Sequence, residues 1–176
     1  MIFQPLPLAG AFVISIEPHQ DERGFFARSF CREEFGQQRL ETSFVQNSIS
    51  FNARRGTLRG MHFQRAPHEE TKVVRCTRGA AYDVIIDLRP GSASWGKWAG
   101  VEISADNHLM VYVPAGFAHG FKTLTDDTEL EYQISTAYAP QAAAGVRWND
   151  PRFAIDWPHT PELIVSDRDA AYLLVA

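Results

Sequence analysis

The first residues whose types and spacing could do chemistry lie in the segment Leu58–Gln64. This segment places Arg59 and His62 three residues apart, with Gly60 between them. Histidine is the most frequent general base in enzymes, and a glycine beside it permits close approach of another stretch of backbone. A single histidine can also be held by local hydrogen bonds alone, so this segment by itself leaves the choice between a base and a structural residue open.

A second histidine, His119, lies in Pro114–Phe121, where proline and glycine predict a turn before the next strand. The spacing P-x-G-x-x-H also occurs in metal-binding barrels of the cupin type, and a metal-dependent cupin enzyme is therefore one alternative. That alternative needs an H-x-H pair and a downstream glutamate, whereas Phe63 and Gln64 follow His62. Since three or four ligands must converge on an ion, the sequence predicts no metal site.

Lys72, Tyr132 and two aspartates complete the set of residues that could act on a substrate. Lys72 begins an apolar strand and has the parity of Val74, so we expect its ammonium to point inward, where an oxyanion or a phosphate would offset its charge. Tyr132 shares a strand face with apolar neighbours. Asp83 and Asp169 are the acids expected among these groups, although either could instead cap a turn or a helix.

The elements that must position these side chains are short β-strands bounded by Gly, Pro, Asn and Asp. Helical signals are restricted to Arg32–Gln38 and to Asp167–Leu174, which follows a Ser166 N-cap, and Pro140–Ala144 is interpreted as a connection. The pattern predicts a single domain over residues 1–176, an all-β antiparallel barrel with a few short helices. We expect its strands at Phe12–Ile16, Lys72–Cys76, Ala81–Leu88, Trp98–Ser104, His108–Val113 and Leu130–Ser135.

Length, charge and cysteine content exclude several classes of protein. At 176 residues the chain can bury a full core without disulfides, and its two cysteines, Cys31 and Cys76, indicate a reducing compartment. A net charge of −4 argues against a nucleic-acid partner, since such a partner needs a basic face. The N-terminal residues show no secretory signal, and no stretch has the length of a membrane span. We therefore expect a cytoplasmic protein that contacts neither nucleic acid nor membrane.

Eight segments, taken in order, resemble the dTDP-4-dehydrorhamnose 3,5-epimerase family. They are Asp21–Phe26, Leu58–Gln64, Lys72–Arg75, Tyr82–Arg89, Pro114–Phe121, Tyr132, Tyr138–Pro140 and Trp148–Pro151, and the match covers nearly the whole chain. The resemblance implies a cupin-like jelly-roll barrel that forms a homodimer and needs no metal or other cofactor. It also implies a nucleoside-diphosphate-4-keto-6-deoxyhexose as substrate, inverted at C3, at C5 or at both carbons beside the C4 ketone, in deoxysugar or polysaccharide biosynthesis.

The same resemblance gives each candidate residue a role. His62 would remove the proton, Asp169 would orient the imidazole, and Lys72 would stabilise the enolate oxygen. Tyr132 would return a proton from the opposite face, and His119 resembles a histidine that lies beside the sugar. The resemblance places the remaining substrate contacts, mostly to the nucleotide, at Arg23, Arg28, Gln46, Arg59, Tyr138 and Arg168.

Three departures from the family pattern concern the binding end of the site. Arg28 stands where the family typically has glutamate, Asn47-Ser48 where it has Asp-Asn, and Ala144 where it has glutamate. A guanidinium that points into the base pocket would suit the acceptors of cytosine, whereas Arg28 turned outward would leave thymine as the base. A mono-epimerase that acts on a CDP- or GDP-linked 4-keto sugar is therefore an alternative to the dTDP enzyme. A non-catalytic binding module is disfavoured, because a binder needs no base and acid on opposite faces.

Overall fold

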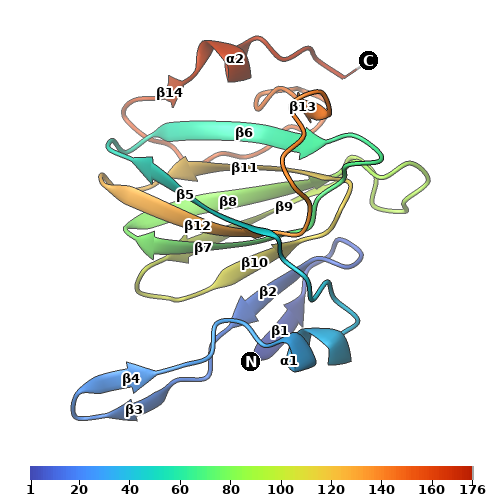
Figure 1. The fold of residues 1–176 in the computed structure, drawn as a ribbon. Coiled ribbons are helices and arrows are strands. Elements are labelled where there is room, and N and C mark those ends of the chain that lie inside the picture. The colour runs from blue at the N-terminus through green and yellow to red at the C-terminus, as the bar shows by residue number, and fades with distance from the viewer. Residues whose placement is uncertain (176) are drawn as a thin grey trace.

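The protein is described by a computed structural model that covers residues 1–175, and most of its strands form two facing sheets (Figure 1). The first sheet has six antiparallel strands, in the spatial order β1 (Ile2–Pro5), β2 (Phe12–Ser15), β10 (Met110–Val113), β7 (Lys72–Arg78), β12 (Thr128–Ile134) and β5 (Gln46–Asn52). The second sheet has the order β13 (Ala143–Gly145), β6 (Thr57–Gln64), β11 (Phe117–Thr123), β8 (Ala80–Asp87) and β9 (Trp98–Ser104), and β14 (Ile164–Val165) joins β6 in parallel. This arrangement confirms the predicted all-β, jelly-roll fold class.

Two helices and one hairpin complete the described chain. The helix α1 (Arg32–Gln37) packs Phe35 against the outer face of the first sheet, and α2 (Asp167–Ala170) lies over β6. The strands β3 (His19–Asp21) and β4 (Gly24–Phe26) pair only with each other and project from the body of the molecule (Figure 1). No helix within residues 1–175 is long and apolar enough to cross a membrane.

Alternation along the strands divides the core into three apolar clusters. The inward rows of the two sheets meet in a central cluster, in which Val74, Val111 and Leu130 of the first sheet pack with Ile85 and Phe121 of the second. Because successive side chains point to opposite faces, the outward row of the first sheet packs under α1 instead, and that of the second sheet packs under residues 146–157. At one end of the sandwich the inward rows carry polar side chains, and the candidate site lies there.

The structure corrects two of the predicted strand boundaries. The strand expected to start at His108 starts at Met110, because His108 has a φ of 54° in a turn held by the side chain of Asn107. Residues 143–144, predicted to lie in a connection, belong to β13, because they pair with the C-terminal end of β6. The first difference comes from a turn side chain and the second from a contact distant in sequence. The apolar pattern of a segment contains information on neither.

The helix predicted at Asp167–Leu174 is shorter than expected. The Ser166 N-cap is confirmed, since its hydroxyl accepts a hydrogen bond from the Asp169 N–H, but α2 ends at Ala170. Beyond α2, Val175 packs against the outer cluster of the second sheet, and its N–H donates to Asp150 Oδ2, in the turn after β13, at 2.6 Å. A tertiary contact thus overrides the local helical pattern after one turn.

Candidate active site

The polar ends of the two sheets enclose a cavity of ≈ 390 Å³ among β5, β6, β7, β11 and β12. Sites for small molecules in proteins are typically about 300–1,000 Å³ in volume. Seven of the predicted site residues line this cavity: Gln46, Arg59, His62, Lys72, His119, Tyr132 and Tyr138. Folding therefore brings together residues that are separated by up to 92 positions in the sequence.

An irregularity at Gly60 places Arg59 and His62 on the same face of β6. Residues three apart in a regular strand point to opposite faces. Here Gly60 has a φ of +136°, and the pairing of β6 with β11 shifts register beside it. A Cβ atom at Gly60 would lie 2.5 Å from the Cα of Gly120, so only glycine fits this close approach. The glycine noted in the sequence thus lets both side chains reach the cavity.

His62 forms a dyad with the buried carboxylate of Asp169 on α2. The Nε2 atom of His62 lies 2.7 Å from Asp169 Oδ1, and the Gly60 N–H donates to Asp169 Oδ2 at 3.2 Å. Burial disfavours the charged carboxylate, but the hydrogen bonds from His62, Gly60 and Ser166 outweigh it and hold the pKa of Asp169 below its ordinary value. An ionised Asp169 fixes the orientation of the ring and favours the imidazolium that forms when His62 accepts a proton.

A second buried dyad, between His119 and Asp83, lies beside the first. His119 on β11 is the direct register partner of His62 on β6, and its Nε2 lies 2.7 Å from Asp83 Oδ2. The ring of His119 also packs edge-on against Tyr132, with a centroid separation of 5.8 Å. The expectation that Asp83 and Asp169 lie among the candidate groups is met, with one aspartate behind each histidine.

Tyr132 and Lys72 approach the cavity from the sheet opposite His62. Both belong to neighbouring strands of the first sheet, β12 and β7, whereas His62 belongs to the second. Burial, with a smaller contribution from the carboxylate of Asp83, raises the pKa of Tyr132 far above its ordinary value, so the phenol stays protonated at neutral pH. The inward direction expected for Lys72 is confirmed, since its side chain lines the cavity. A potential base and a potential acid therefore face one cavity from opposite walls.

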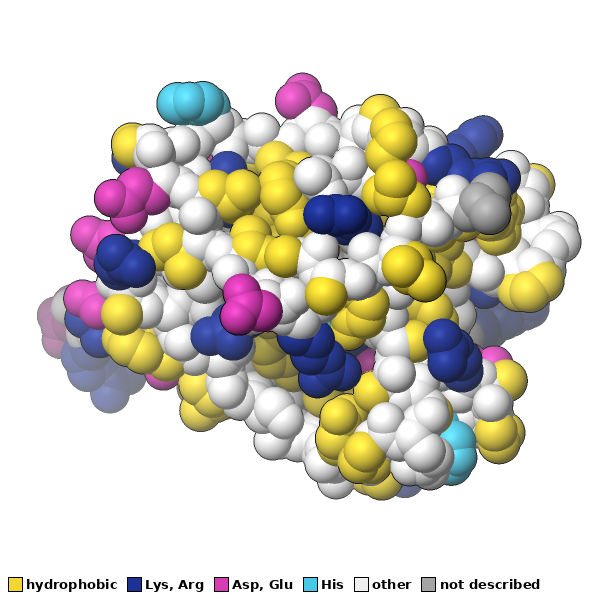
Figure 2. Space-filling view, turned by 90° about the horizontal axis from the view of Figure 1, so that it is seen from above, with side chains coloured by type: hydrophobic (Ala, Val, Ile, Leu, Met, Phe, Trp, Pro, Cys, Tyr) yellow, Lys and Arg dark blue, Asp and Glu magenta, His cyan; other side chains and the backbone are white. Residues whose placement is uncertain are grey.

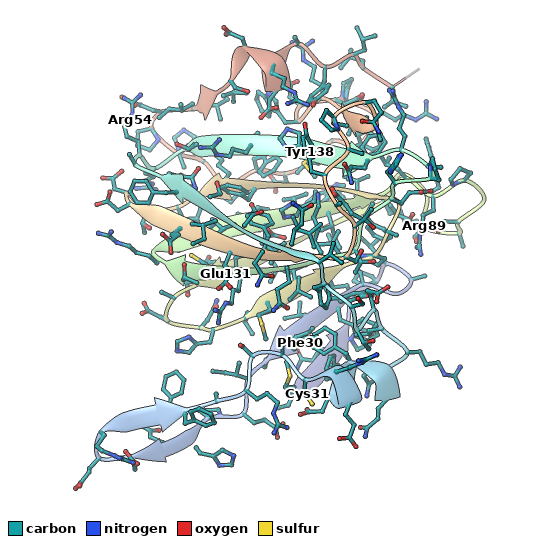
Figure 3. The ribbon with its side chains drawn as sticks, viewed as in Figure 1. Phe30, Cys31, Arg54, Arg89, Glu131 and Tyr138 are labelled. Atoms are coloured by element: carbon teal, nitrogen blue, oxygen red, sulfur yellow. The ribbon has the colours of Figure 1, made fainter. Side chains whose placement is uncertain are left out.

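Polar contacts fix the side chains at the rim of the cavity. The Tyr138 N–H donates to Gln46 Oε1 at 2.5 Å, which anchors the segment between β12 and β13 that carries Tyr138 (Figure 3). Arg59 Nε donates to Asn52 Oδ1 at 2.8 Å. Exposed Arg168 on α2 lies beside the hydroxyls of Tyr172 and Tyr138, which raise the pKa of Arg168. Two guanidinium groups and an aromatic ring thus stand near the opening.

Comparison with known proteins decides the family. A model of the dTDP-4-dehydrorhamnose 3,5-epimerase family matches residues 5–176, nearly the entire chain. The chain belongs to this family. It is 46% identical over 160 residues to the dTDP-4-dehydrorhamnose 3,5-epimerase of Escherichia coli, which covers 89% of this chain and 86% of the relative.

Solved structures of the epimerase family share the fold over almost the full length. The dTDP-4-dehydrorhamnose 3,5-epimerase of Bacillus anthracis, crystallised with TDP and PPi, is 39% identical with a TM-score of 0.95, and the match covers 99% of both chains. ChmJ, a 3'-monoepimerase from Streptomyces bikiniensis in complex with dTDP-quinovose, is 35% identical with a TM-score of 0.90 and covers 97% of this chain and 86% of its own. The predicted family and its jelly-roll fold are thereby confirmed.

Two arginines that the epimerase resemblance singled out lie outside the cavity of their own chain. Arg23, at the tip of the β3–β4 hairpin, is exposed and pairs with Asp21 at 2.5 Å. Arg28 follows β4 and pairs with Glu34 of α1 at 2.8 Å, so within this chain it turns away from the cavity. Their roles in substrate binding stay predictions.

One charged residue of the epimerase cavity, Glu70, was not predicted as a site residue from the sequence. Glu70 lies in the loop before β7 and lines the cavity beside Lys72. Its position two residues before Lys72, and hence on the same side of an extended segment, is a signal that could have identified it. Within residues 1–175, no group of three or more His, Cys, Asp or Glu side chains is placed to hold a metal ion.

Proposed function

We propose that this protein epimerises a dTDP-linked 4-keto-6-deoxyhexose at C3 and C5. The observation that carries the proposal is the placement of His62 and Tyr132 on opposite sheets around one cavity. Inversion at carbon requires that a proton leave one face and another arrive at the opposite face. A pocket with a base on one wall and an acid on the other meets that requirement for a planar intermediate held between them.

In the proposed reaction each residue acts on one part of the substrate. His62 removes the proton from the carbon beside the C4 ketone, and the C–H electron pair moves to the ketone oxygen as an enolate. Asp169 stabilises the resulting imidazolium, and the ammonium of Lys72 stabilises the enolate oxygen. Tyr132 then donates its proton to the other face of the carbon, and the ketone re-forms. Exchange with solvent then removes the proton from His62 and returns one to Tyr132, and the same steps at the second carbon give the double epimer.

The rim residues are suited to the nucleoside diphosphate. Arg59 and Arg168 would contact the phosphates, because guanidinium groups bind phosphate oxygens in a forked geometry. Gln46 holds Tyr138 at the opening, where its exposed ring can stack on a base. On the α2 face, cationic and acidic side chains are interspersed among hydrophobic ones (Figure 2), unlike the basic face that a nucleic-acid backbone needs. His119 would contact the sugar.

A homodimer is part of the proposal. Phe26 on the projecting hairpin is 79% exposed, and the edge strand β5 with the residue before it exposes Val45, Ile49 and Phe51. Exposed apolar groups on a hairpin and a sheet edge are typical of an interface between proteins. In such a dimer the hairpin would carry Arg23 toward the cavity of the second copy. Light scattering should give twice the chain mass of 19.8 kDa, with Phe26→Asp shifted toward the monomer; a monomeric wild type contradicts the dimer.

The proposed chemistry needs neither a metal nor an organic cofactor, since a lysine ammonium stabilises the enolate and side chains move the protons. The cytoplasm is the proposed location. Both cysteines, Cys31 and Cys76, are unpaired, which fits a reducing compartment.

The experiment that tests the function uses dTDP-4-keto-6-deoxyglucose in deuterated water. The product should carry deuterium at both C3 and C5, with both centres inverted, as read by NMR. Deuterium at C3 alone would instead indicate a mono-epimerase, a possibility favoured by the likeness to the 3'-monoepimerase ChmJ. Parallel incubations with the CDP- and GDP-linked sugars test the base, and faster turnover of either would overturn the assignment to dTDP. Absence of deuterium from every substrate would refute the function.

A further inference from the structure

Glu70 is the one carboxylate among the described residues that line the cavity. Its Oε1 atom lies 2.7 Å from the Nζ atom of Lys72, and the two side chains are only 12% and 10% exposed. The pair therefore stands inside the cavity wall and not in bulk solvent. A carboxylate at this place is unexpected in a site that must attract an anionic substrate, and its partner suggests what it does.

The contact with Glu70 restricts the movement of Lys72, whose ammonium must be held in place for the reaction. A lysine ammonium is a compact charge on a flexible four-carbon stem with three rotatable N–H donors. Contact with Glu70 fixes the position of Nζ and occupies one donor, which leaves the other two for a substrate oxygen. Electrostatic stabilisation is most effective when the charged group is already in place before the reaction begins.

A direct chemical role for Glu70 fits the geometry less well. Its carboxylate is already engaged by the ammonium of Lys72 at hydrogen-bonding distance. It also lies on the Lys72 side of the cavity, away from His62, whose dyad with Asp169 already provides a base.

We propose that Glu70 is a positioning residue, which holds the ammonium of Lys72 where the C4 oxygen of the substrate gains negative charge. The inference rests on the proposed function. It assigns Glu70 an effect that operates only through Lys72. An acceptor oxygen at the right distance should therefore matter more than the negative charge itself.

Three substitutions separate geometry from charge. Glu70→Gln keeps an acceptor oxygen at the same reach, Glu70→Asp keeps the charge but withdraws it by one methylene, and Glu70→Ala removes both. With dTDP-4-keto-6-deoxyglucose, kcat should fall about 10–100-fold in Glu70→Ala while KM stays unchanged, since a misplacement of about 1 Å can cost 10²-fold. Glu70→Gln should retain more activity than Glu70→Asp. Glu69→Gln is the matched control, because Glu69 lines a different cavity.

A double-mutant cycle with Lys72→Met tests the dependence on lysine. In the Lys72→Met background, Glu70→Ala should change kcat by less than about twofold, because the group through which it acts is gone. Three results would each overturn the inference: a loss of kcat as large as in the wild-type background, a raised KM at constant kcat, or a higher activity of Glu70→Asp than of Glu70→Gln. Thermal unfolding of every variant confirms the fold, and the Gln–Asp comparison decides the matter if Glu70→Ala does not fold. Wild-type turnover in the same assay tests the proposed function separately; an inactive wild type overturns both.

Discussion

The substitution Asp169→Asn removes one charge from the dyad while it keeps nearly the same shape. Asp169 is 4% exposed, and its Oδ1 atom lies 2.7 Å from His62 Nε2. The neutral amide can still accept from the Gly60 N–H, so α2 should remain docked on β6. What the variant loses is the negative charge beside His62 at the moment when His62 takes the substrate proton.

The size of the loss follows from the geometry of the pair. Two unit charges whose centres are about 4 Å apart interact by about 4 kcal/mol at an effective dielectric constant of about 20. The side chain of His62 is 40% exposed, so solvent screens part of this interaction and about 2–4 kcal/mol is the expected cost. At about 1.4 kcal/mol per factor of ten, kcat should fall between about 30-fold and 1,000-fold.

The assay compares turnover and solvent deuterium exchange in wild type and variant under saturating substrate. Both should fall together, because proton removal precedes both exchange and inversion. Asp167→Asn, an exposed aspartate on the same helix, is the matched control and should leave both rates near those of the wild type. If Asp169→Asn keeps kcat within about threefold of wild type, Asp169 does not support the base and the dyad argument is refuted.

Three further predictions concern the base, the metal and the acid stability of the fold. His62→Ala should abolish both turnover and deuterium exchange while the protein stays folded; exchange at the wild-type rate would show that another group is the base. Exhaustive chelation should leave kcat unchanged, and activity that is lost and then restored by one divalent ion would contradict this. Burial alone would raise the pKa of Asp87, but hydrogen bonds from Arg89, Ser92 and Ser94 hold it well below its ordinary value. Its ionised form therefore stabilises the fold above the unfolded-state pKa, and this stabilisation is lost as the pH falls below about 4. Asp87→Asn should cost about 1.5–3 kcal/mol at pH 7 and flatten the acid limb of a denaturation series; an unchanged acid limb would refute the assignment.

The alternation of apolar residues predicted which side chains point into the cavity more accurately than it predicted the number and bounds of the strands. The parity of Lys72 with Val74 and the run around Tyr132 gave the inward faces of β7 and β12, because alternation is a local property. The long edge strand β5 was not predicted, since its polar, partly exposed residues acquire their structure by pairing with β12, which is distant in sequence. The projecting hairpin β3–β4 was not predicted either, because all of its residues are exposed and it therefore shows no alternation of buried and exposed side chains.

The two histidines could be predicted from the sequence more readily than the partners of their imidazole rings. Each could be named from its motif, but the partners Asp83 and Asp169 lie 36 and 107 residues away. The resemblance already paired Asp169 with His62, but only the pairing of β11 with β8 shows that Asp83 stands behind His119. Glu70 was not predicted as a site residue, since its contact with Lys72 depends on the path of the loop before β7.

The central claim is that His62 and Tyr132 act on opposite faces of the substrate, and the variant Tyr132→Phe tests it most directly. The measurement follows both deuterium uptake and configuration at C3 and C5 of dTDP-4-keto-6-deoxyglucose in deuterated water. The account predicts that Tyr132→Phe still exchanges the substrate proton through His62 while net inversion falls by about 10²–10⁴, so that deuterated substrate of unchanged configuration is recovered. Equal loss of exchange and inversion, or inversion at the wild-type rate, would contradict it.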